Sequence, residues 1–371
     1  MKVIGKVGRR LLKSIGLLTL LGMFVVPSAA MADKYRVALI HPGTPTDLSW
    51  SNAWIDGAKN AMAGNPNIEV VSVDLVFDPA SYLQQGAAFA SQGFDFVLMA
   101  HGAMVDQGIT LAEQFPNVQF CVAPHHPSEA TLPPNQPKNL CWIDVAQHNA
   151  NFFAGALAAM VTKSGHVASL NGFAFPALTR QAEGFHLGAR CVNPDIRFSQ
   201  QYINTWTDTG IAKAAAQAVF ATDADVIMAP TDSAVFGIVQ AAKEALGQGR
   251  GQVWIIPSYY ESQVLGPEVV LTSAIHGLTF ASQAMIERGA SGSIGESSFH
   301  DFDATNNPEI YAPVYDNIRK LLSPEQLARY EEIAEKVRSG EITIPDETTG
   351  DYPIGAIDSG AAVDLAAIGC I

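Results

Sequence analysis

Two tryptophans and the carboxylates near them are the side chains of this sequence best suited to bind a small molecule. Trp50 follows Asp47 by three positions, and Trp206 lies one predicted loop before Asp232. Two indole rings can sandwich a flat ring, while one or two carboxylates accept hydrogen bonds from its N–H groups. This combination suits an aromatic heterocycle. A pyranose also stacks on tryptophan, so the rings alone leave a sugar as an alternative.

Several of these side chains have a second possible role. Asp47 could serve only as the cap of the helix that follows it, and Trp50 could belong to the core. His101 opens another predicted helix, where its imidazole could hydrogen-bond a ligand or only satisfy the backbone. The residue types are therefore compatible with a binding site without proving one.

A catalytic site is the main alternative. His101 could transfer protons together with Asp47 or Asp232. The pair His125-His126 could hold a metal ion, but adjacent imidazoles in a proline-rich loop point apart more readily than they converge. The sequence has no GxSxG, P-loop or HExxH motif and no GxGxxG after a predicted strand. We therefore expect no catalysis, no cofactor and no metal site.

The elements that must position these residues alternate between short β-branched runs and longer amphipathic stretches. This alternation is typical of βαβ units and a parallel sheet. In the first half, strands are predicted at 35–40, 68–76, 94–100 and 118–122, with helices at 51–62, 80–92 and 105–115. In the second half, strands are predicted at 166–170, 196–202, 225–229 and 253–256, with helices at 149–162, 179–191, 210–221 and 235–246.

Two similar α/β halves place the candidate residues together. In an open parallel sheet, ligands bind beyond the carboxyl ends of the strands. The loops after the strands carry the tryptophans and carboxylates, so two facing lobes would line a cleft with them. Between the halves, residues 124–147 are predicted to form a loop with a first crossover near Asp144.

Composition limits the kind of protein and partner. The chain has 371 residues, of which 48% are hydrophobic and 16% charged, so it can bury two cores and is too apolar to be disordered. The formal net charge is -14, from 22 Lys and Arg against 36 Asp and Glu. Because a nucleic-acid partner requires a positive surface, we expect no nucleic acid.

Residues 1–32 have the features of a signal peptide. Basic residues precede an apolar stretch at Ile15–Val26, and Ala30-Met31-Ala32 supplies the small residues for cleavage after Ala32. The stretch is shorter than the roughly 20 residues that span a bilayer, and an uncleaved signal anchor is the alternative. Cleavage would leave 17 Lys and Arg against 36 Asp and Glu, an acidic exported chain.

The four cysteines can form two disulfides in an oxidising compartment, with three possible connectivities. We favour Cys121 with Cys141, because they flank one loop and would close a ring of about 20 residues, worth roughly 3 kcal/mol in the chain-entropy model. Cys191 and Cys370 remain, and their bond would fix the C-terminal tail to the body.

The C-terminal part has its own pattern. Residues 321–339 are predicted to be helical, with Ser323 as the cap, Pro324 in the first turn and Gly340 as the stop. Residues 342–344 are predicted to form a short strand. Residues 346–371 are an extension without a recognisable motif.

A series of short motifs runs through the chain up to about Pro345. They are Asp47-Leu48-Ser49-Trp50, Trp54 with Gly57, 94–98, 153–160 with Thr162-Lys163, Gly184-Phe185, Gly188-Ala189, 193–196, 271–273 and 339–345. In this order they resemble the basic membrane protein family, also called the purine nucleoside receptor family, of ABC-transporter substrate-binding proteins.

The resemblance implies a fold and a function. The fold would be α/β, with two Rossmann-like lobes whose parallel sheets are joined by hinge crossovers, as in type I periplasmic binding proteins. The protein would close on a purine nucleobase or nucleoside and deliver it to an ABC permease in the inner membrane. We expect a monomer. No cysteine precedes Cys121, so the lipid anchor common in the family is not expected and the protein would be free in the periplasm.

The resemblance also suggests roles for individual residues. Asp47 is similar to the family's base-binding carboxylate, Trp50 lies near one stacking ring, and Trp206 is similar to the opposing aromatic. The family's Asn after the first ring is Ser51 here, its ribose-binding Asp aligns with Ser258, and its Lys aligns with His276.

These departures weaken recognition of the sugar, so a free base is expected as much as a nucleoside, unless Asp232, Tyr259 or Tyr260 replaces the missing contacts. A binding protein for a different small ligand, such as a sugar or another heterocycle, or a sensor module that presents its ligand to a receptor rather than to a permease, stays an alternative. The expected ligand-binding residues are Asp47, Trp50, His101, Trp206, Asp232, Ser258, Tyr259 and Tyr260.

The expected domain organisation follows from these elements. Crossovers are predicted near Asp144, near His276 and after Ser291. The expected parts are a signal peptide at 1–32, an N-terminal lobe at 33–143 plus 275–291, a C-terminal lobe at 144–274, a crossover with the C-terminal helix and strand at 292–345, and the extension at 346–371.

Overall fold

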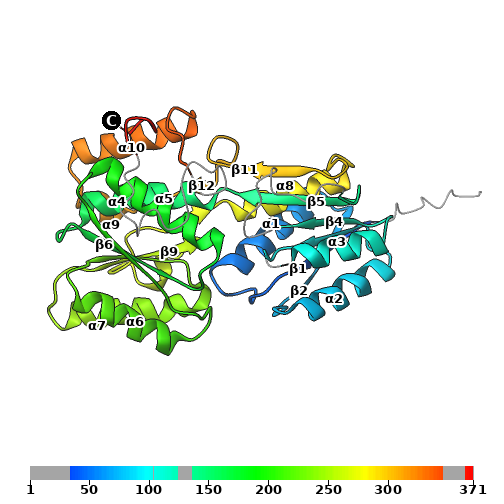
Figure 1. Cartoon of the computed structure of the whole chain (residues 1–371), viewed down its shortest axis with the longest axis horizontal. Helices are drawn as coiled ribbons and strands as arrows, with labels where there is room; N and C mark the ends of the chain where they lie inside the picture. Colours follow the sequence, from blue (N-terminus) through cyan, green and yellow to red (C-terminus); the bar gives the residue numbers. More distant parts are fainter. Residues whose placement is uncertain (1–33, 103, 124–135, 346–363, 371) are drawn as a thin grey trace, which may run out of the picture. The chain divides into compact units, whose positions relative to one another are not determined.

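The computed structural model describes residues 34–102, 104–123, 136–345 and 364–370. Within them lie two six-stranded sheets with helices between the strands (Figure 1). The predicted α/β fold of two lobes is confirmed. The expected signal peptide, His125-His126 and most of the extension lie outside the described residues.

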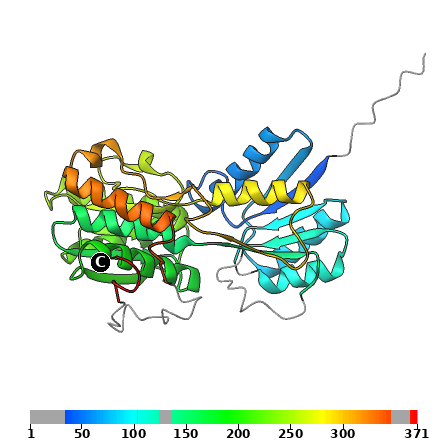
Figure 2. The same ribbon diagram turned by 90° about the horizontal axis from the view of Figure 1, so that it is seen from above.

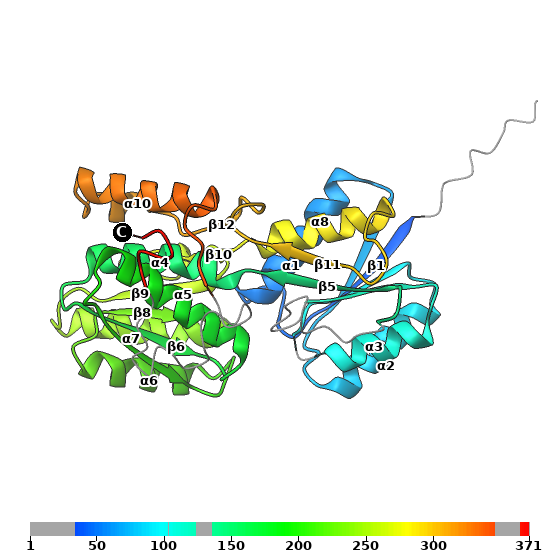
Figure 3. The ribbon, with the colours of Figure 1, turned by 45° about the horizontal axis from the view of Figure 1, so that its top comes forward.

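The first sheet is parallel throughout, in the order β11-β5-β4-β3-β1-β2. Its strands are β1 (Tyr35–Ile40), β2 (Ile68–Val73), β3 (Phe96–Met99), β4 (Gln119–Val122), β5 (Leu140–Val145) and β11 (Phe299–Phe302). Helices α1 (Trp50–Gly64) and α8 (Leu278–Ala290) cover one face, and α2 (Pro79–Ser91) and α3 (Val105–Gln114) cover the other (Figure 3).

The second sheet has the order β12-β10-β9-β8-β6-β7, and only the edge pair β10–β12 is antiparallel. Its strands are β6 (His166–Asn171), β7 (Arg197–Tyr202), β8 (Val226–Ala229), β9 (Trp254–Tyr259), β10 (Ala274–His276) and β12 (Ile310–Tyr311). Its principal helices are α4 (Gln147–Val161), α5 (Pro176–Val192), α6 (Thr209–Ala221), α7 (Val235–Gly247) and α10 (Pro324–Arg338), with short helical turns at η2 (Asp232–Ala234), η3 (Gln263–Leu265) and α9 (Asp316–Arg319).

Strand β1 shows why these runs form buried parallel strands. Val37 and Leu39 pack into the core on one face of the sheet, while Ala38 and Ile40 pack into the core on the other. Successive side chains of a strand point to opposite faces, and both faces here are covered by helices. An uninterrupted apolar run is therefore the pattern such a strand requires.

The chain passes between the two sheets at three places. It leaves the first sheet after β5 and enters α4, returns from β10 to α8, and passes from β11 to β12. The predicted helix after Ser323 is present as α10, with a full capping box in which Ser323 and Gln326 bond to each other's backbone N–H. It packs along α4 of the second lobe (Figure 2).

Two sequence predictions of local structure are wrong. Leu140–Val145, expected to be loop, is the fully buried strand β5. Residues 342–344, expected to be a strand, have no strand assignment. The predicted separation of 292–345 from the N-terminal lobe also differs from the structure, because β11 pairs with β5 inside the first sheet. Strand β5 pairs with β4 and with the distant β11, and such partners are not specified by the local sequence.

Both disulfides have the connectivity that the sequence favours. Cys121 and Cys141 are opposite each other on the paired strands β4 and β5 and are bonded. Cys191 of α5 is bonded to Cys370, which is buried. The Arg329 guanidinium also donates to the Cys370 carbonyl over 2.8 Å. The described end of the C-terminal extension is thereby fixed to the second lobe.

Candidate ligand-binding site

A cavity of about 240 Å³ lies at the carboxyl ends of strands from both sheets, and we call it the ring-lined pocket. Its position agrees with the rule that ligands bind beyond the carboxyl ends of parallel strands. It is lined by Pro42 after β1, Trp50 of α1, Phe77 after β2, His101 and Gly102 after β3, Gln147 of α4, Phe173 and Phe175 after β6, Ala177 and Leu178 of α5, Trp206 after β7, Asp232 after β8 and Tyr259 of β9.

The first lobe contributes Trp50 and His101 to the pocket. The Trp50 indole N–H donates to the Ala100 carbonyl over 2.8 Å, which fixes the ring at the start of α1. The Trp50 ring meets Tyr259 edge-on, with centroids 5.6 Å apart. Burial lowers the pKa of His101 to about 4. At neutral pH this imidazole is therefore uncharged, with one nitrogen that donates and one that accepts.

The second lobe contributes a cluster of three rings. Phe173 and Phe175 are stacked, with centroids 5.7 Å apart, and Trp206 lies 5.2 Å from Phe173. Trp206 sits directly on the backbone of Gly172, where a Cβ atom would be only 2.1 Å from the indole. Glycine is therefore required at position 172 for Trp206 to occupy this place.

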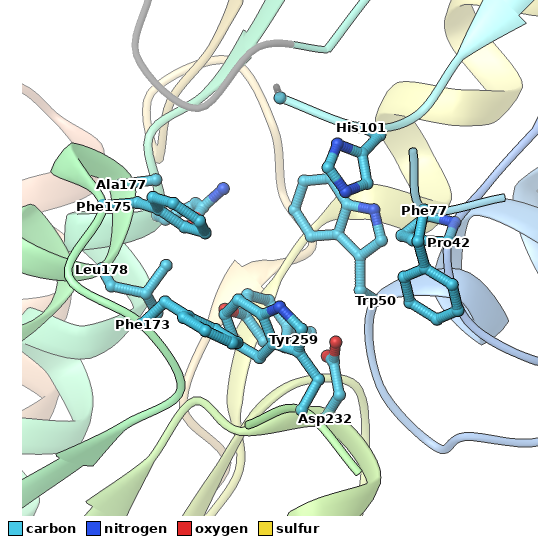
Figure 4. A pocket seen from close by; sticks show the side chains of 13 residues that line it. Pro42, Trp50, Phe77, His101, Phe173, Phe175, Ala177, Leu178, Asp232 and Tyr259 are labelled. Atoms are coloured by element: carbon cyan, nitrogen blue, oxygen red, sulfur yellow. The ribbon is translucent and has the colours of Figure 1, made fainter. Parts of the chain in front are cut away.

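The two sets of rings lie on opposite sides of the cavity. Figure 4 shows Trp50 and His101 on one side, with Phe175 and Leu178 on the other. A space bounded by rings from two lobes has the shape and surface that a flat aromatic ligand needs for stacking.

Asp232 is the carboxylate of the ring-lined pocket. It comes from η2 of the second lobe and accepts a hydrogen bond of 2.7 Å from the Ser49 hydroxyl of the first. The Trp50 backbone N–H also donates to it. Burial, and then the nearby Asp47 charge, raise the pKa of Asp232 to about 7. The group can therefore change between acceptor and donor close to neutral pH.

Asp232 and Tyr259 also share an unusual backbone. Their φ angles are 46° and 79°, in the left-handed region that side chains other than glycine rarely adopt. Such strain persists only where the surrounding structure enforces it, and it is concentrated at functional sites. Both residues line the ring-lined pocket, so the strained backbone directs both side chains toward the same space.

The structure places Asp47 at the beginning of α1, in the helix-capping arrangement that the sequence offered as one of two roles. Its carboxylate accepts from the backbone N–H groups of Ser49, Ser51 and Asn52 at 2.9, 3.2 and 3.0 Å. These groups form the beginning of α1, and Asp47 is not among the residues that line the ring-lined pocket. It caps the helix that positions Trp50, and its charge acts on Asp232.

Three further candidates point elsewhere. Ser258 is buried in β9 with its hydroxyl 3.7 Å from the Met228 sulfur. His276 is buried beside Asn151 and Tyr259. Tyr260 donates to Asp56 over 2.7 Å and lines a second cavity of about 400 Å³. We call this the acidic cavity; its lining includes Asp56, Tyr260, Glu261, Glu309 and Tyr311.

The structure adds lining residues that sequence reasoning did not select. Phe173 and Phe175 directly follow a predicted strand, and this position could have identified them. Phe77 follows β2 in the same way. Gln147 was not recognisable, because it follows β5, the strand that the sequence did not reveal. Its contribution depends on contacts with residues far away in the chain.

The described ranges contain no group of three or more His, Cys, Asp or Glu side chains that could hold a metal ion. His101 and Asp232, considered above as a possible proton-transfer pair, both line the ring-lined pocket. Among the helices that the structure describes, none is long and apolar enough to cross a membrane.

Comparison with known proteins gives consistent matches. Residues 34–346 match the family model described as Bmp, ABC transporter substrate-binding protein PnrA-like. The chain is 24% identical over 333 residues to the purine-binding protein of Brucella abortus, with 87% of each chain covered. It is 25% identical over 241 residues to basic membrane protein A of Borreliella burgdorferi, covering 64% of this chain and 67% of that protein.

A solved structure supports the fold. A solute-binding protein of an ABC transporter system from Aeropyrum pernix matches this chain with a TM-score of 0.75 and 16% identity, over 90% of this chain and 99% of that chain. At this identity the match concerns the arrangement of the lobes and sheets, which is that of type I periplasmic binding proteins.

Proposed function

Because this chain belongs to the PnrA-like family of ABC transporter substrate-binding proteins, we propose that it binds a purine base in the ring-lined pocket for delivery to a membrane permease. The observation that carries the proposal is the pocket itself, in which rings from both lobes surround a single carboxylate. The family implies a small-molecule ligand and a permease partner. The purine, the contacts and the transport step are our proposal.

Stacking would supply much of the affinity. The purine ring would lie between Trp50 on one side and the cluster of Phe173, Phe175 and Trp206 on the other. Stacking of a base on an aromatic side chain contributes roughly 1–3 kcal/mol. Several ring faces can therefore provide a large share of binding without any charged partner.

Hydrogen bonds would then orient the ring. Asp232 in its ionised form accepts from a purine N–H, and the neutral His101 ring adds a polar edge to the same lining. The relative from Brucella abortus is named for purine binding, and purines have ring N–H groups and ring nitrogen acceptors on the same flat surface. Sugars lack this combination, since their hydroxyls leave the plane of the ring.

A base fits the pocket better than a nucleoside. Ser258 and His276 occupy the positions that the resemblance assigns to ribose recognition, and both side chains are buried away from the ring-lined pocket. Tyr260, another candidate for the sugar, bonds to Asp56 in the acidic cavity. Paired hydroxyls would thus find few charged acceptors, which supports a free base as the ligand.

Capture would occur outside the cytoplasm. The sequence predicts export by residues 1–32 with cleavage after Ala32, and substrate-binding proteins of importers act on the outer side of the membrane. The three passes of the chain between the lobes would let them close around the base. The closed form would then be the one presented to the permease.

A thermal-unfolding screen of residues 33–371 tests the proposal. Adenine, guanine, hypoxanthine and xanthine would be compared with their nucleosides, with uracil and with glucose. A ligand at 100 times its Kd adds about 2.7 kcal/mol of stability. We expect purine bases to raise the unfolding midpoint more than nucleosides do. A shift with glucose alone, or with no purine, would contradict the proposal.

A further inference from the structure

A network of buried amides adjoins the ring-lined pocket and is not used by the contacts described above. It consists of Gln147, Asn151 and Gln181, which are at most 4% exposed. Gln147 lines the pocket, whereas the other two lie behind it on α4 and α5. An amide has a donor end and an acceptor end, so its orientation determines what it offers to a ligand.

The orientation of Asn151 is set by the backbone. Its Nδ2 lies 3.1 Å from the Gln147 carbonyl, which can only accept a hydrogen bond, so this atom must be the donor. The same Nδ2 lies 3.3 Å from Gln181 Oε1 and 3.3 Å from His276 Nε2, so its two protons are shared among three acceptors. Burial lowers the pKa of His276 to about 3, so its ring is neutral and this nitrogen can accept.

Asn151 in turn orients Gln181. Because Gln181 Oε1 accepts from Asn151, Gln181 Nε2 faces the other way. There it donates both to Gln147 Oε1 and to Tyr259 Oη, the latter over 3.2 Å. Reversing the Gln181 amide would place oxygen against oxygen at Gln147 and nitrogen against nitrogen at Asn151. In a buried network each such mismatch is costly.

Gln181 therefore orients Gln147. Its Oε1 is occupied by Gln181, which leaves Nε2 as the free end of the amide. No other described residue makes a hydrogen bond to Gln147 Nε2, and the residue lines the ring-lined pocket. The Tyr259 hydroxyl accepts from Gln181, so its own proton is available as a second donor. We call this series of hydrogen bonds, from the Gln147 backbone carbonyl through Asn151 and Gln181 to the Gln147 side chain, the relay. It starts at a backbone carbonyl and ends on donors beside the pocket.

We propose that this relay makes Gln147 a specificity-determining residue that donates a hydrogen bond from Nε2 to a ring nitrogen or carbonyl oxygen of the ligand. The inference rests on the proposed function and adds to it the polarity of one ligand edge. Asp232 would accept from an N–H on the ligand, while Gln147 would require an acceptor at another position. Gln181 is then a positioning residue, because it acts only through Gln147 and Tyr259.

Deaza analogues test the acceptor directly. Adenine would be titrated by calorimetry together with its 1-deaza, 3-deaza and 7-deaza analogues, and hypoxanthine with its 3-deaza and 7-deaza analogues. In each analogue a C–H replaces one ring nitrogen that accepts hydrogen bonds. Adenine and hypoxanthine themselves differ at the 6 position. We expect removal of one acceptor to weaken binding roughly 5- to 100-fold, the effect of leaving a buried donor unpaired. In Gln147→Ala the ratio of the analogue's Kd to the parent's Kd should fall to below two.

Gln181→Glu separates positioning from a general structural effect. Its two carboxylate oxygens would accept from Asn151 and Gln147, so Gln147 would turn and present Oε1 to the ligand. We expect the discrimination between parent and deaza analogue to disappear although Gln147 is unchanged. A merely structural role would weaken both ligands in parallel and keep their ratio. If this variant fails to fold, Gln181→Met removes the donor with similar volume and should also reduce the ratio.

Two results would overturn the inference. One is that purines bind the wild-type protein while every deaza analogue lies within twofold of its parent and hypoxanthine, which has a 6-carbonyl, lies within twofold of adenine, which has none. The other is that the ratio survives in Gln181→Glu. Either leaves the proposed function intact, because purine binding itself would have been observed.

Failure of the proposed function would appear differently, as the absence of purine binding. The relay can then be tested without a ligand by NMR of the side-chain amides. The Gln181 amide protons, both hydrogen-bonded, should exchange slowly with water, while those of Gln147 should exchange fast. Equal or reversed protection would contradict the relay.

Discussion

The ring-lined pocket and the acidic cavity use similar residue types and share Tyr259 in their linings, yet their chemistry differs. In the acidic cavity the carboxylates are already engaged. Asp56 accepts from Lys59 and Tyr260, Glu261 accepts from Tyr315 over 2.6 Å, and Glu309 accepts from the Phe280 N–H over 3.0 Å.

In the ring-lined pocket, by contrast, aromatic side chains from both lobes predominate and Asp232 is the one carboxylate of the lining. The comparison teaches that tyrosines and acids in loops do not by themselves indicate a ligand site. Asp232 also accepts hydrogen bonds, from the Ser49 hydroxyl and the Trp50 N–H. What distinguishes the two cavities is therefore the aromatic surface that both lobes present to a ligand.

The largest expected effect comes from the cluster of rings in the second lobe. Trp206→Ala should weaken purine binding by about 1–3 kcal/mol, or roughly 5- to 150-fold, because one aromatic surface is lost. Tyr260→Ala is the matched control, since it removes an aromatic ring from the acidic cavity. Calorimetry should find its affinity within twofold of wild type. Equal losses in the two variants would mean that the pockets have been assigned incorrectly.

The next effect concerns pH. The pKa of Asp232 is raised to about 7, so the carboxylate that accepts from a purine N–H becomes available only as pH rises through that value. Affinity should increase about tenfold between pH 6 and pH 8 and level off above. In Asp232→Asn the dependence should be lost. Affinity that falls with rising pH would show that the protonated form of Asp232 is the one that binds.

The same titration affects stability with the opposite sign. A raised pKa means that the folded protein favours the protonated carboxyl group. Its contribution is fully present below the ordinary pKa of about 4 and is lost as pH rises through about 7. In chemical unfolding across this range, the free energies of unfolding of wild type and Asp232→Asn should therefore converge at low pH.

Asp47→Ala distinguishes the role of Asp47 from that of Asp232. Asp47 accepts from three backbone N–H groups, so its loss should lower the free energy of unfolding by about 0.5–2 kcal/mol. Removal of its charge should also move the pH midpoint of binding downward, because Asp47 raises the pKa of Asp232. Urea unfolding and calorimetry at several pH values measure both. An unchanged stability with a large affinity loss would restore Asp47 as a ligand contact.

The smallest effect is expected in the acidic cavity. Tyr260→Phe removes the hydrogen bond to Asp56 but keeps the ring. The loss should be about 0.5–1.5 kcal/mol of stability, with no change in ligand affinity. A changed affinity would indicate that the acidic cavity takes part in binding.

Sequence reasoning predicted the fold because its signal is local and repeated. Buried strands such as β1 are continuous apolar runs, and the amphipathic helices between them identify parallel sheets. It also located the loops that carry Trp50, His101, Trp206, Asp232 and Tyr259, all of which line the ring-lined pocket.

Sequence could not assign the roles of neighbouring polar groups. Asp47 shortly precedes α1 and Asp232 begins η2, and only the path of the folded chain makes one a cap and brings the other to the pocket. The bond between Ser49 and Asp232 joins residues 183 positions apart. Gln147 was missed for a similar reason, since Gln181 orients it across two packed helices. Contacts of this kind form only when distant parts of the chain pack together.

The most direct test of the central claim is a crystal structure of residues 33–371 with the purine base that stabilises the protein most. We expect the base in the ring-lined pocket, between Trp50 and the rings of Phe173, Phe175 and Trp206, with a ring N–H within hydrogen-bond distance of Asp232. A base bound against Tyr260 and Asp56 in the acidic cavity, or a ring-lined pocket occupied by a ligand without an aromatic ring, would contradict it.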